Sequence, residues 1–311
     1  MVDEYHHQPV MPVEAMEALA VTASGCYVDA TYGRGGHAAR LLEYLDFRGR
    51  LIIMDKDPQA IQAAQTQWGD DRRVMIVQSA FSQLARTLAG LGLGGGIDGI
   101  LFDLGVSSPQ LDDARRGFSF RREGPLDMRM NPAAGVSAAN WLAQAGEAEI
   151  ATVLRDYGEE RYARRIARAI VQARRVQPVT TTFELAAIVA AASPGREPGK
   201  DPATRTFQAI RIHINHELEE LRSGLQQAVA ALAPGGRLVA ISFHSLEDRI
   251  VKRFMRREAE GVPLPRRLPV MEVARHHSLR LIGRALRPSA AEVAGNPRAR
   301  SAVMRVAEKQ E

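Results

Sequence analysis

Glycines and a carboxylate suited to a cofactor site lie close together near the start of this 311-residue chain. Residues 28–37 have the sequence VDATYGRGGH, in which an apolar run ends at Asp29 and a turn with Gly33, Gly35 and Gly36 follows. Glycine allows positive φ and leaves no Cβ between the backbone and a ligand. Such a turn between a strand and a helix presents free backbone N–H groups to whatever binds there. We therefore expect a ligand at this turn, and a purely structural turn is the alternative.

Three carboxylates favour one class of ligand. Asp29 would repel a pyrophosphate and attract a cationic amino-acid group. Asp55 ends a second apolar run roughly 20 residues past the turn, where such units carry the acid that binds the ribose hydroxyls. Asp103 ends a later run, and all three acids are expected at the carboxyl ends of strands in one sheet. These features favour S-adenosylmethionine over a dinucleotide, and a nicotinamide-dependent oxidoreductase is the alternative.

The loop after Asp103 contains side chains that suit methyl transfer to a nucleobase. An exocyclic amine is a poor nucleophile because its lone pair is delocalised into the ring. Hydrogen-bond acceptors such as Asp103 and Ser107 would help by taking up the proton after transfer, so we predict both as catalytic. Alternatively, Ser107 and Ser108 only build the turn before Pro109. Gln110 either binds the methionine carboxylate or faces solvent.

Composition limits the class of protein. No stretch approaches the roughly 18–20 apolar residues of a membrane span, and the N-terminus lacks the pattern of a signal peptide. A single cysteine, Cys26, excludes an internal disulfide and a cysteine-built zinc site. No cluster of His, Asp and Glu has convincing metal-ligand spacing. We expect a cytoplasmic protein with no membrane contact and no metal.

The charge is unevenly distributed, although the net charge is only +5. From Arg249 to the end there are 15 Lys and Arg against 6 Asp and Glu, whereas the rest of the chain has 26 against 30. A basic C-terminal region indicates a polyanionic partner such as a nucleic acid. A solvated basic surface is the alternative.

Short apolar runs alternate with helical patterns in the first hundred residues, which predicts a parallel sheet with helices on both faces. Strands are expected at residues 27–30, 51–54, 74–77, 99–103 and 237–243, with a terminal antiparallel hairpin at 277–282 and 302–306. Helices are expected at residues 36–44 and 58–68, the second capped by Asp57. A helix at 245–257 has Ser245 and Asp248 at capping-box spacing.

From about residue 110 to residue 217 only helices and loops are expected. Thr181 and Glu184 form a capping box there, and Asp201 with Pro202 starts one long helix that ends near Ala233. We therefore predict that residues 1–110 and 217–311 form a cofactor-binding domain. Residues 111–216 would form an inserted, all-helical substrate-recognition domain.

Six motifs are similar to those of a known family. They lie at residues 31–37, 103–112, 116–120, 124–130, 241–249 and 296–301. With them, the chain resembles the ribosomal RNA small-subunit methyltransferase H family, also called MraW, over essentially its whole length. The resemblance implies an α/β fold, a class I (Rossmann-like) methyltransferase sheet with an inserted all-helical domain. It also implies S-adenosyl-L-methionine-dependent methylation of N4 of a cytidine in the decoding region of bacterial small-subunit (16S) ribosomal RNA.

The resemblance also implies which residues contact the cofactor. They are Gly35, Gly36, His37, Asp55, Phe81, Asp103 and Gln110. From the sequence alone, Phe81 either stacks near the adenine or is plain core.

The basic residues best placed to contact the RNA are Arg121, Arg129, Arg298 and Arg300. A basic helix at residues 161–175 either faces phosphates or is an ordinary exposed helix. The expected partner is small-subunit ribosomal RNA or the ribosomal subunit, and a homodimer is compatible with the sequence. A non-catalytic RNA-binding or assembly factor on the same scaffold is the alternative.

Overall fold

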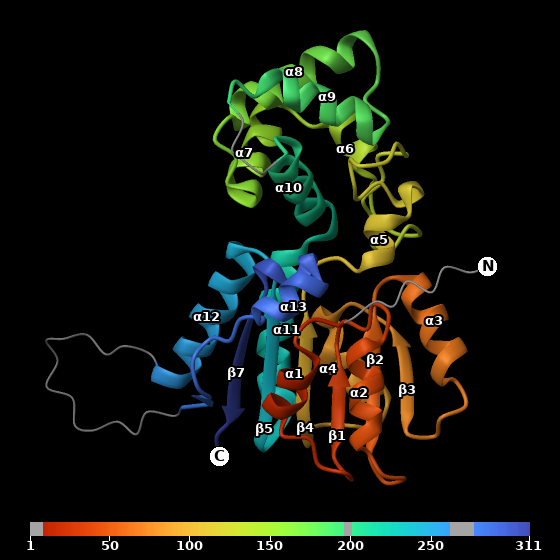
Figure 1. Ribbon diagram of the computed structural model, residues 1–311, viewed down its shortest axis with the longest axis vertical. Helices are drawn as coiled ribbons and strands as arrows, with labels where there is room; N and C mark the ends of the chain where they lie inside the picture. The colour runs from red at the N-terminus through yellow and green to blue at the C-terminus, as the bar shows by residue number, and fades with distance from the viewer. Residues whose placement is uncertain (1–8, 196–200, 262–276) are drawn as a thin grey trace, which may run out of the picture. The chain divides into compact units, whose positions relative to one another are not determined.

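The computed structural model describes residues 9–195, 201–261 and 277–311. The chain divides into two compact units, the first made of Met1–Gly105 with Leu218–Glu311 and the second of Val106–Glu217. In the described residues, the first unit contains a sheet with helices, and the second contains helices and no sheet (Figure 1). Cofactor binding by the first unit and substrate recognition by the second stay predictions.

A seven-stranded sheet forms the centre of the first unit (Figure 1). Its strands are β1 (Cys26–Asp29), β2 (Arg50–Asp55), β3 (Val74–Gln78), β4 (Ile97–Asp103), β5 (Leu232–Ser242), β6 (Leu279–Leu281) and β7 (Val303–Lys309). Their order is β3-β2-β1-β4-β5-β7-β6. Strands β1 to β5 are parallel, and β7 pairs antiparallel with both β5 and β6. The predicted parallel sheet and its terminal hairpin are confirmed.

Helices pack on both faces of this sheet. One face is covered by α1 (Pro12–Leu19), α2 (Gly36–Tyr44) and α3 (Pro58–Trp68), the other by α4 (Leu84–Gly90), α11 (Glu217–Ala231) and α12 (Ser245–Glu260). The helix α13 (Ala290–Gly295) and short 3₁₀ helices at Phe81–Gln83 and Pro297–Ser301 also belong to this unit. Successive strand residues point to opposite faces, so Val28 lies in one apolar core and Tyr27 in the other. In the parts of the chain that the structure describes, no helix combines the length and apolar character that crossing a bilayer requires.

Two helix starts test the capping predictions. Asp57 caps α3 as predicted, since its side chain accepts a hydrogen bond from a backbone N–H of the first turn. The helix α12 is capped by His244, which forms a capping box with Glu247. The predicted box of Ser245 and Asp248 is therefore wrong by one residue. Histidine is not a favoured N-cap residue, so the sequence pattern pointed to the serine beside it.

The second unit is helical. Its helices are α5 (Ser108–Asp112), a 3₁₀ helix at Ala114–Arg116, α6 (Ala138–Gln144), α7 (Glu147–Gly158), α8 (Ala163–Val176), α9 (Thr182–Ala192) and α10 (Ala203–Asn215). The predicted capping box of Thr181 and Glu184 begins α9. The single long helix expected after Pro202 is wrong, because α10 ends at Asn215 and α11 begins at Glu217. His216 lies between them with φ of +54°, a left-handed conformation that ends a helix.

Candidate active site

Glycine is required twice in the turn between β1 and α2 because neighbouring side chains fill the space. Gly35 has φ of +77°, and a Cβ there would lie 2.5 Å from the ring of Tyr32. A Cβ on Gly36 would lie 2.9 Å from Pro9. Both glycines are therefore needed for the packing of the chain itself. Gly36 is also the first residue of α2, where backbone N–H groups lack partners within the helix.

Three carboxylates meet at the carboxyl ends of β1, β2 and β4, as predicted. Asp29 accepts a hydrogen bond from the Thr31 N–H (3.2 Å), and the Thr31 hydroxyl oxygen accepts one from the Asp103 N–H (2.6 Å). Both oxygens of Asp55 accept backbone N–H groups at 2.8 Å, one of them from Gly33. These bonds connect the glycine turn to the neighbouring strand ends.

His37 lies among these acids. Its Nε2 is 3.5 Å from Oδ2 of Asp103, and its side chain is only 5% exposed. Burial by itself would lower the pKa of His37, but Asp103, together with Asp29 and Glu292, raises it above the ordinary value. Among the described residues, no hydrogen-bond partner is found for either ring nitrogen of His37 or for the buried Oδ1 of Asp103. Buried polar atoms rarely lack a hydrogen-bond partner, and a polar ligand bound here would supply one.

Burial also changes the acidity of the carboxylates. It raises the pKa of Asp29 to about 7, against the lowering effect of His37. It raises the pKa of Asp55 to about 6, although two backbone N–H groups favour its ionised form. Near neutral pH, Asp29 is therefore populated in both its protonated and its ionised form. A cation bound beside it would favour the ionised carboxylates.

Phe81 lies in the 3₁₀ helix after β3 and packs edge-on against Phe102 of β4. The two ring centres are 5.5 Å apart and the ring planes make an angle of 87°. A Cβ on Gly224 of α11 would lie 2.8 Å from the Phe81 ring, so that helix packs closely against it. Phe81 is partly buried at the margin of the core. Its packing role is visible, and the stacking on adenine stays a prediction.

Ser107 and Gln110 belong to the second unit, where they form the start of α5. Ser107 is the N-cap residue, and its backbone N–H donates to Oε1 of Gln110 (2.9 Å). Gln110 is only 6% exposed, so the alternative in which it faces solvent is wrong. Ser107 has a visible structural role in the turn before Pro109. Its catalytic role and the cofactor contact of Gln110 stay predictions.

The four arginines predicted to contact RNA have different surroundings. Arg129 is held by Asp127, whose two carboxylate oxygens accept from Nε (2.9 Å) and Nη2 (2.7 Å). Arg121 is exposed, and no ion pair engages it among the described residues. Arg298 and Arg300 are exposed in the first unit, on the 3₁₀ helix before β7. Their contact with RNA stays a prediction.

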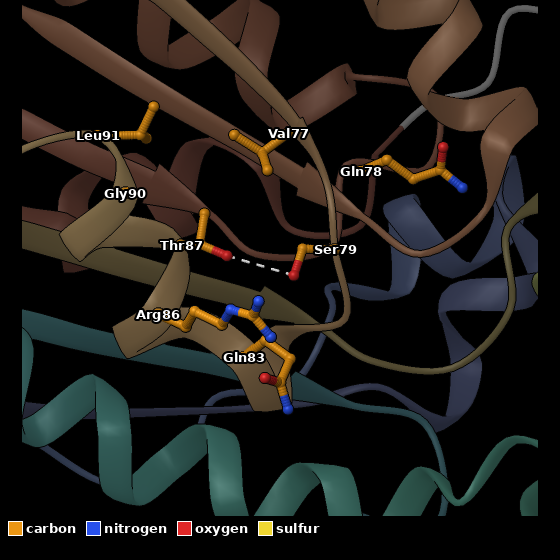
Figure 2. A pocket seen from close by; sticks show the side chains of 8 residues that line it. All are labelled: Val77, Gln78, Ser79, Gln83, Arg86, Thr87, Gly90 and Leu91. Carbon is orange, nitrogen blue, oxygen red and sulfur yellow. Dashed lines mark hydrogen bonds between the residues drawn. The ribbon is translucent and has the colours of Figure 1, made fainter.

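A cavity of about 380 Å³ lies between β3 and α4, and none of the three carboxylates is among the residues that line it (Figure 2). Its lining residues are Val77, Gln78, Ser79, Gln83, Arg86, Thr87, Gly90 and Leu91. Thr87 and Ser79 are joined by a hydrogen bond of 3.2 Å between their hydroxyl oxygens. None of these residues is a predicted catalytic, cofactor or RNA residue. We therefore take the carboxylate cluster, and not this cavity, as the candidate site.

Sequence reasoning missed two residues of this site. Thr31 lies in the motif at residues 31–37, but no local pattern indicates that its hydroxyl accepts the Asp103 N–H. Glu292 of α13 accepts a hydrogen bond from the Met11 N–H (2.7 Å) and acts electrostatically on His37. A contact between residues so distant in the sequence has no local signal.

Comparison with known proteins gives consistent matches. The model of the MraW methylase family matches residues 4–310. The chain is 59% identical to "Ribosomal RNA small subunit methyltransferase H" of Nitrosococcus oceani, over 98% of this chain and 97% of that protein. It is 58% identical to the protein of the same name from Thiobacillus denitrificans, over 97% of each. A solved rRNA methylase of Streptococcus thermophilus overlaps with a TM-score of 0.44 at 10% identity, covering 96% of this chain and 97% of that one.

Proposed function

Because the chain belongs to the MraW methylase family, we propose that it methylates N4 of a cytidine in the decoding region of small-subunit (16S) ribosomal RNA. S-adenosyl-L-methionine is the methyl donor. The observation that carries the proposal is the match of the family over nearly the whole chain, with relatives named for methylation of this RNA. The relatives' names give the RNA that is methylated, and the choice of N4 and of a decoding-region cytidine is the part that we add by proposal.

The residues of the carboxylate cluster fit a cationic methyl donor. The buried Oδ1 of Asp103 has no partner among the described residues, and a positively charged group beside it would supply one. Asp29 adds a second carboxylate to attract the amino group of the methionine part. Asp55 accepts one backbone N–H on each oxygen, and each oxygen keeps a second lone pair for a ribose hydroxyl.

Other residues complete the proposed cofactor site. The N-terminus of α2, with Gly36 and His37, offers backbone N–H groups to the methionine carboxylate. Phe81 packs beside the adenine, and Gln110 contributes its amide. Gly35 allows the turn that presents this helix end.

The chain itself holds the amine and removes its proton. Bound S-adenosylmethionine supplies a methyl group on a positively charged sulfur, which makes that carbon electrophilic. Asp103 accepts a hydrogen bond from the N4 amine, which directs the nitrogen lone pair and gives the departing proton an acceptor. Ser107, four residues further along the chain, is the second proposed acceptor. Holding the amine and the methyl carbon in line supplies much of the remaining rate enhancement.

The target cytidine must be outside a base pair when it is methylated. N4 takes part in base pairing, so the target cytidine has to be unpaired or turned out before it reaches Asp103. Arg121, Arg129, Arg298 and Arg300 are proposed to hold the neighbouring phosphates.

The proposal is tested by mapping methylated cytidines with mass spectrometry in small-subunit ribosomal RNA from cells without this protein. We expect loss of N4-methylcytidine at one decoding-region position and its return with the purified protein and S-adenosylmethionine. Asp103→Ala should abolish transfer and leave the affinity for RNA unchanged, which would eliminate a non-catalytic RNA-binding factor. An unchanged methylation map would refute the proposal.

A further inference from the structure

The outer face of α12 carries cationic side chains on every turn. The exposed residues are Arg249, Lys252, Arg253, Arg256 and Arg257. Residues three and four apart lie on one side of a helix, so these five form a single stripe, which we call the α12 cationic face. The opposite side of the helix buries Val251, Phe254 and Met255 in the core.

Acidic neighbours neutralise only part of this charge. Arg256 pairs with a glutamate of the same helix at 2.6 Å, and Arg257 pairs with another at 3.2 Å. Among the described residues, no ion pair engages Lys252 or Arg253. Exposed pairs of this kind contribute little to stability and are easily exchanged for another anion. The face therefore keeps a net positive charge that is available to a partner.

The helix α12 begins at the same edge of the sheet as the carboxylate cluster. The helix follows β5, and Ile241 near the end of β5 pairs with Asp103 of β4. The first turn of α12 therefore lies at the same edge of the sheet as the carboxylate cluster, within one unit. From that edge the helix runs back beside β7 (Figure 1). Its 16 residues span about 24 Å. A chain bound along this face would lead to the edge where the reaction takes place.

The chemistry of the face favours a phosphate chain. A helix that lies on a membrane exposes apolar residues such as Phe or Leu, which enter the lipid. The large apolar residues of α12 instead face the core, and Phe254 is only 8% exposed. Repeated exposed cations suit the sugar–phosphate backbone of RNA, whose contacts need charge and no base-specific geometry.

We propose that the α12 cationic face binds the phosphates of the RNA strand adjoining the target cytidine. The inference rests on the proposed function, since it takes the substrate to be RNA that reaches Asp103. It assigns a role to the basic C-terminal region, in which Arg249 begins the excess of positive charge.

The test removes two charges from the face and two from a distant surface. Lys252→Gln with Arg253→Gln is the test variant. Arg72→Gln with Arg86→Gln is the matched control, because both residues are exposed, neither has an ion pair among the described residues, and they lie beside β3 at the other end of the sheet. The melting temperature and the affinity for S-adenosylmethionine should equal those of the wild type in both variants.

Binding to unmodified small-subunit ribosomal RNA is measured over a range of salt concentrations. At about 0.1 M salt the test variant should bind on the order of tenfold more weakly, and the slope of log affinity against log salt should be shallower by about 1.4. The control should change less than about twofold. An equal loss in both variants, or no loss in either, would overturn the inference. So would loss of binding to anionic lipid vesicles with RNA affinity intact.

Methyl transfer by the wild-type protein separates the two claims. If the wild type transfers no methyl group to this RNA, the proposed function fails and the inference fails with it. If it transfers the group normally and the test variant binds RNA as tightly as the wild type, only the α12 inference fails.

Discussion

His37 Nε2 lies 3.5 Å from Asp103 Oδ2, a contact that joins the first turn of α2 to the last residue of β4. The distance is long for a strong hydrogen bond. The side chains are only 5% and 22% exposed, however, so water screens their attraction weakly. We infer that His37 fixes the orientation of Asp103, the carboxylate proposed to face both the methyl donor and the accepting amine.

Replacing His37 by asparagine should therefore weaken binding of S-adenosylmethionine. Loss of a buried partner of a carboxylate costs about 1.5–3 kcal/mol, which predicts a dissociation constant at least about tenfold higher. Titration calorimetry of the folded variant measures the constant directly. The exposed His277 offers the control, because His277→Asn removes an imidazole far from the carboxylates in the sequence and should leave the constant unchanged. Equal affinities in both variants would contradict the role given to His37.

The stability of the protein should depend on the ionisation of Asp29. Burial raises the pKa of this carboxyl to about 7, whereas its value in an unfolded chain is about 3.9. The folded state thus holds the proton more tightly, so the contribution of Asp29 to stability is fully present below about pH 4 and is lost as the pH rises to about 7.

The variant Asp29→Asn cannot titrate, so its free energy of unfolding should fall less steeply than that of the wild type between about pH 4 and pH 7. Urea unfolding at several pH values in this window gives both curves. Part of the slope should remain, because burial also raises the pKa of Asp55, to about 6. Asp46→Asn is the control, since the backbone N–H of Arg48 lowers the pKa of this partly exposed carboxyl. Identical slopes in the wild type and Asp29→Asn would show that Asp29 is ionised in the folded protein.

Local signals were sufficient for the elements that hold the site. Apolar runs, glycines and the Asp57 cap were enough to predict where α2 and α3 begin and end. The same apolar runs predicted the acid at the end of each central strand. These features depend on residues adjacent in the sequence, which is why a pattern detects them. The ligand class suggested by Asp29 depended on charge alone, and the family match supports it.

Features that depend on the path of the chain in space were not predictable. No local rule places a left-handed residue at His216 between two helices that could have been one. The contact of Glu292 with Met11 joins the two ends of the chain. Gly35 was explained by the approach of a ligand, whereas Tyr32 occupies the space where its Cβ would lie. Tyr32 is only three residues from Gly35, but the sequence pattern does not show that its ring folds back over the turn.

The role of Gly35 is open to a matched comparison with Gly92. Both have similar positive φ, +77° and +74°, but a Cβ on Gly92 would meet nothing within 4 Å. Gly92→Ala should lower the free energy of unfolding only by the cost of a left-handed backbone at a residue with a Cβ, about 1–2 kcal/mol. Gly35→Ala adds a contact of 2.5 Å with Tyr32, and overpacking adds about 1–3 kcal/mol.

Urea unfolding of the two alanine variants measures this difference. Combining Gly35→Ala with Tyr32→Leu should recover part of the loss, since the clash is with the tyrosine ring. Equal destabilisation by both glycine replacements would mean that Tyr32 moves aside freely and that Gly35 is not needed for packing.

Arg121 and Arg129 should respond differently to mutation, although both are proposed to hold RNA. Arg121 is exposed, so Arg121→Gln should weaken RNA binding about fivefold at about 0.1 M salt. Arg129 is already engaged by Asp127 through bonds of 2.9 and 2.7 Å. Burial would raise the pKa of Asp127, but Arg129 lowers it overall, so the carboxylate stays charged and competes with phosphate.

Asp127→Asn removes this competitor and keeps the size of the side chain. If Arg129 faces the RNA, the variant should bind it more tightly and with a steeper dependence on salt, because one more cation becomes available to phosphate. The exposed pair of Arg155 and Asp156 provides the control, and Asp156→Asn should leave the affinity unchanged. If Asp127→Asn melts at the wild-type temperature but binds RNA more weakly or equally well, Arg129 stabilises its loop and does not contact the RNA.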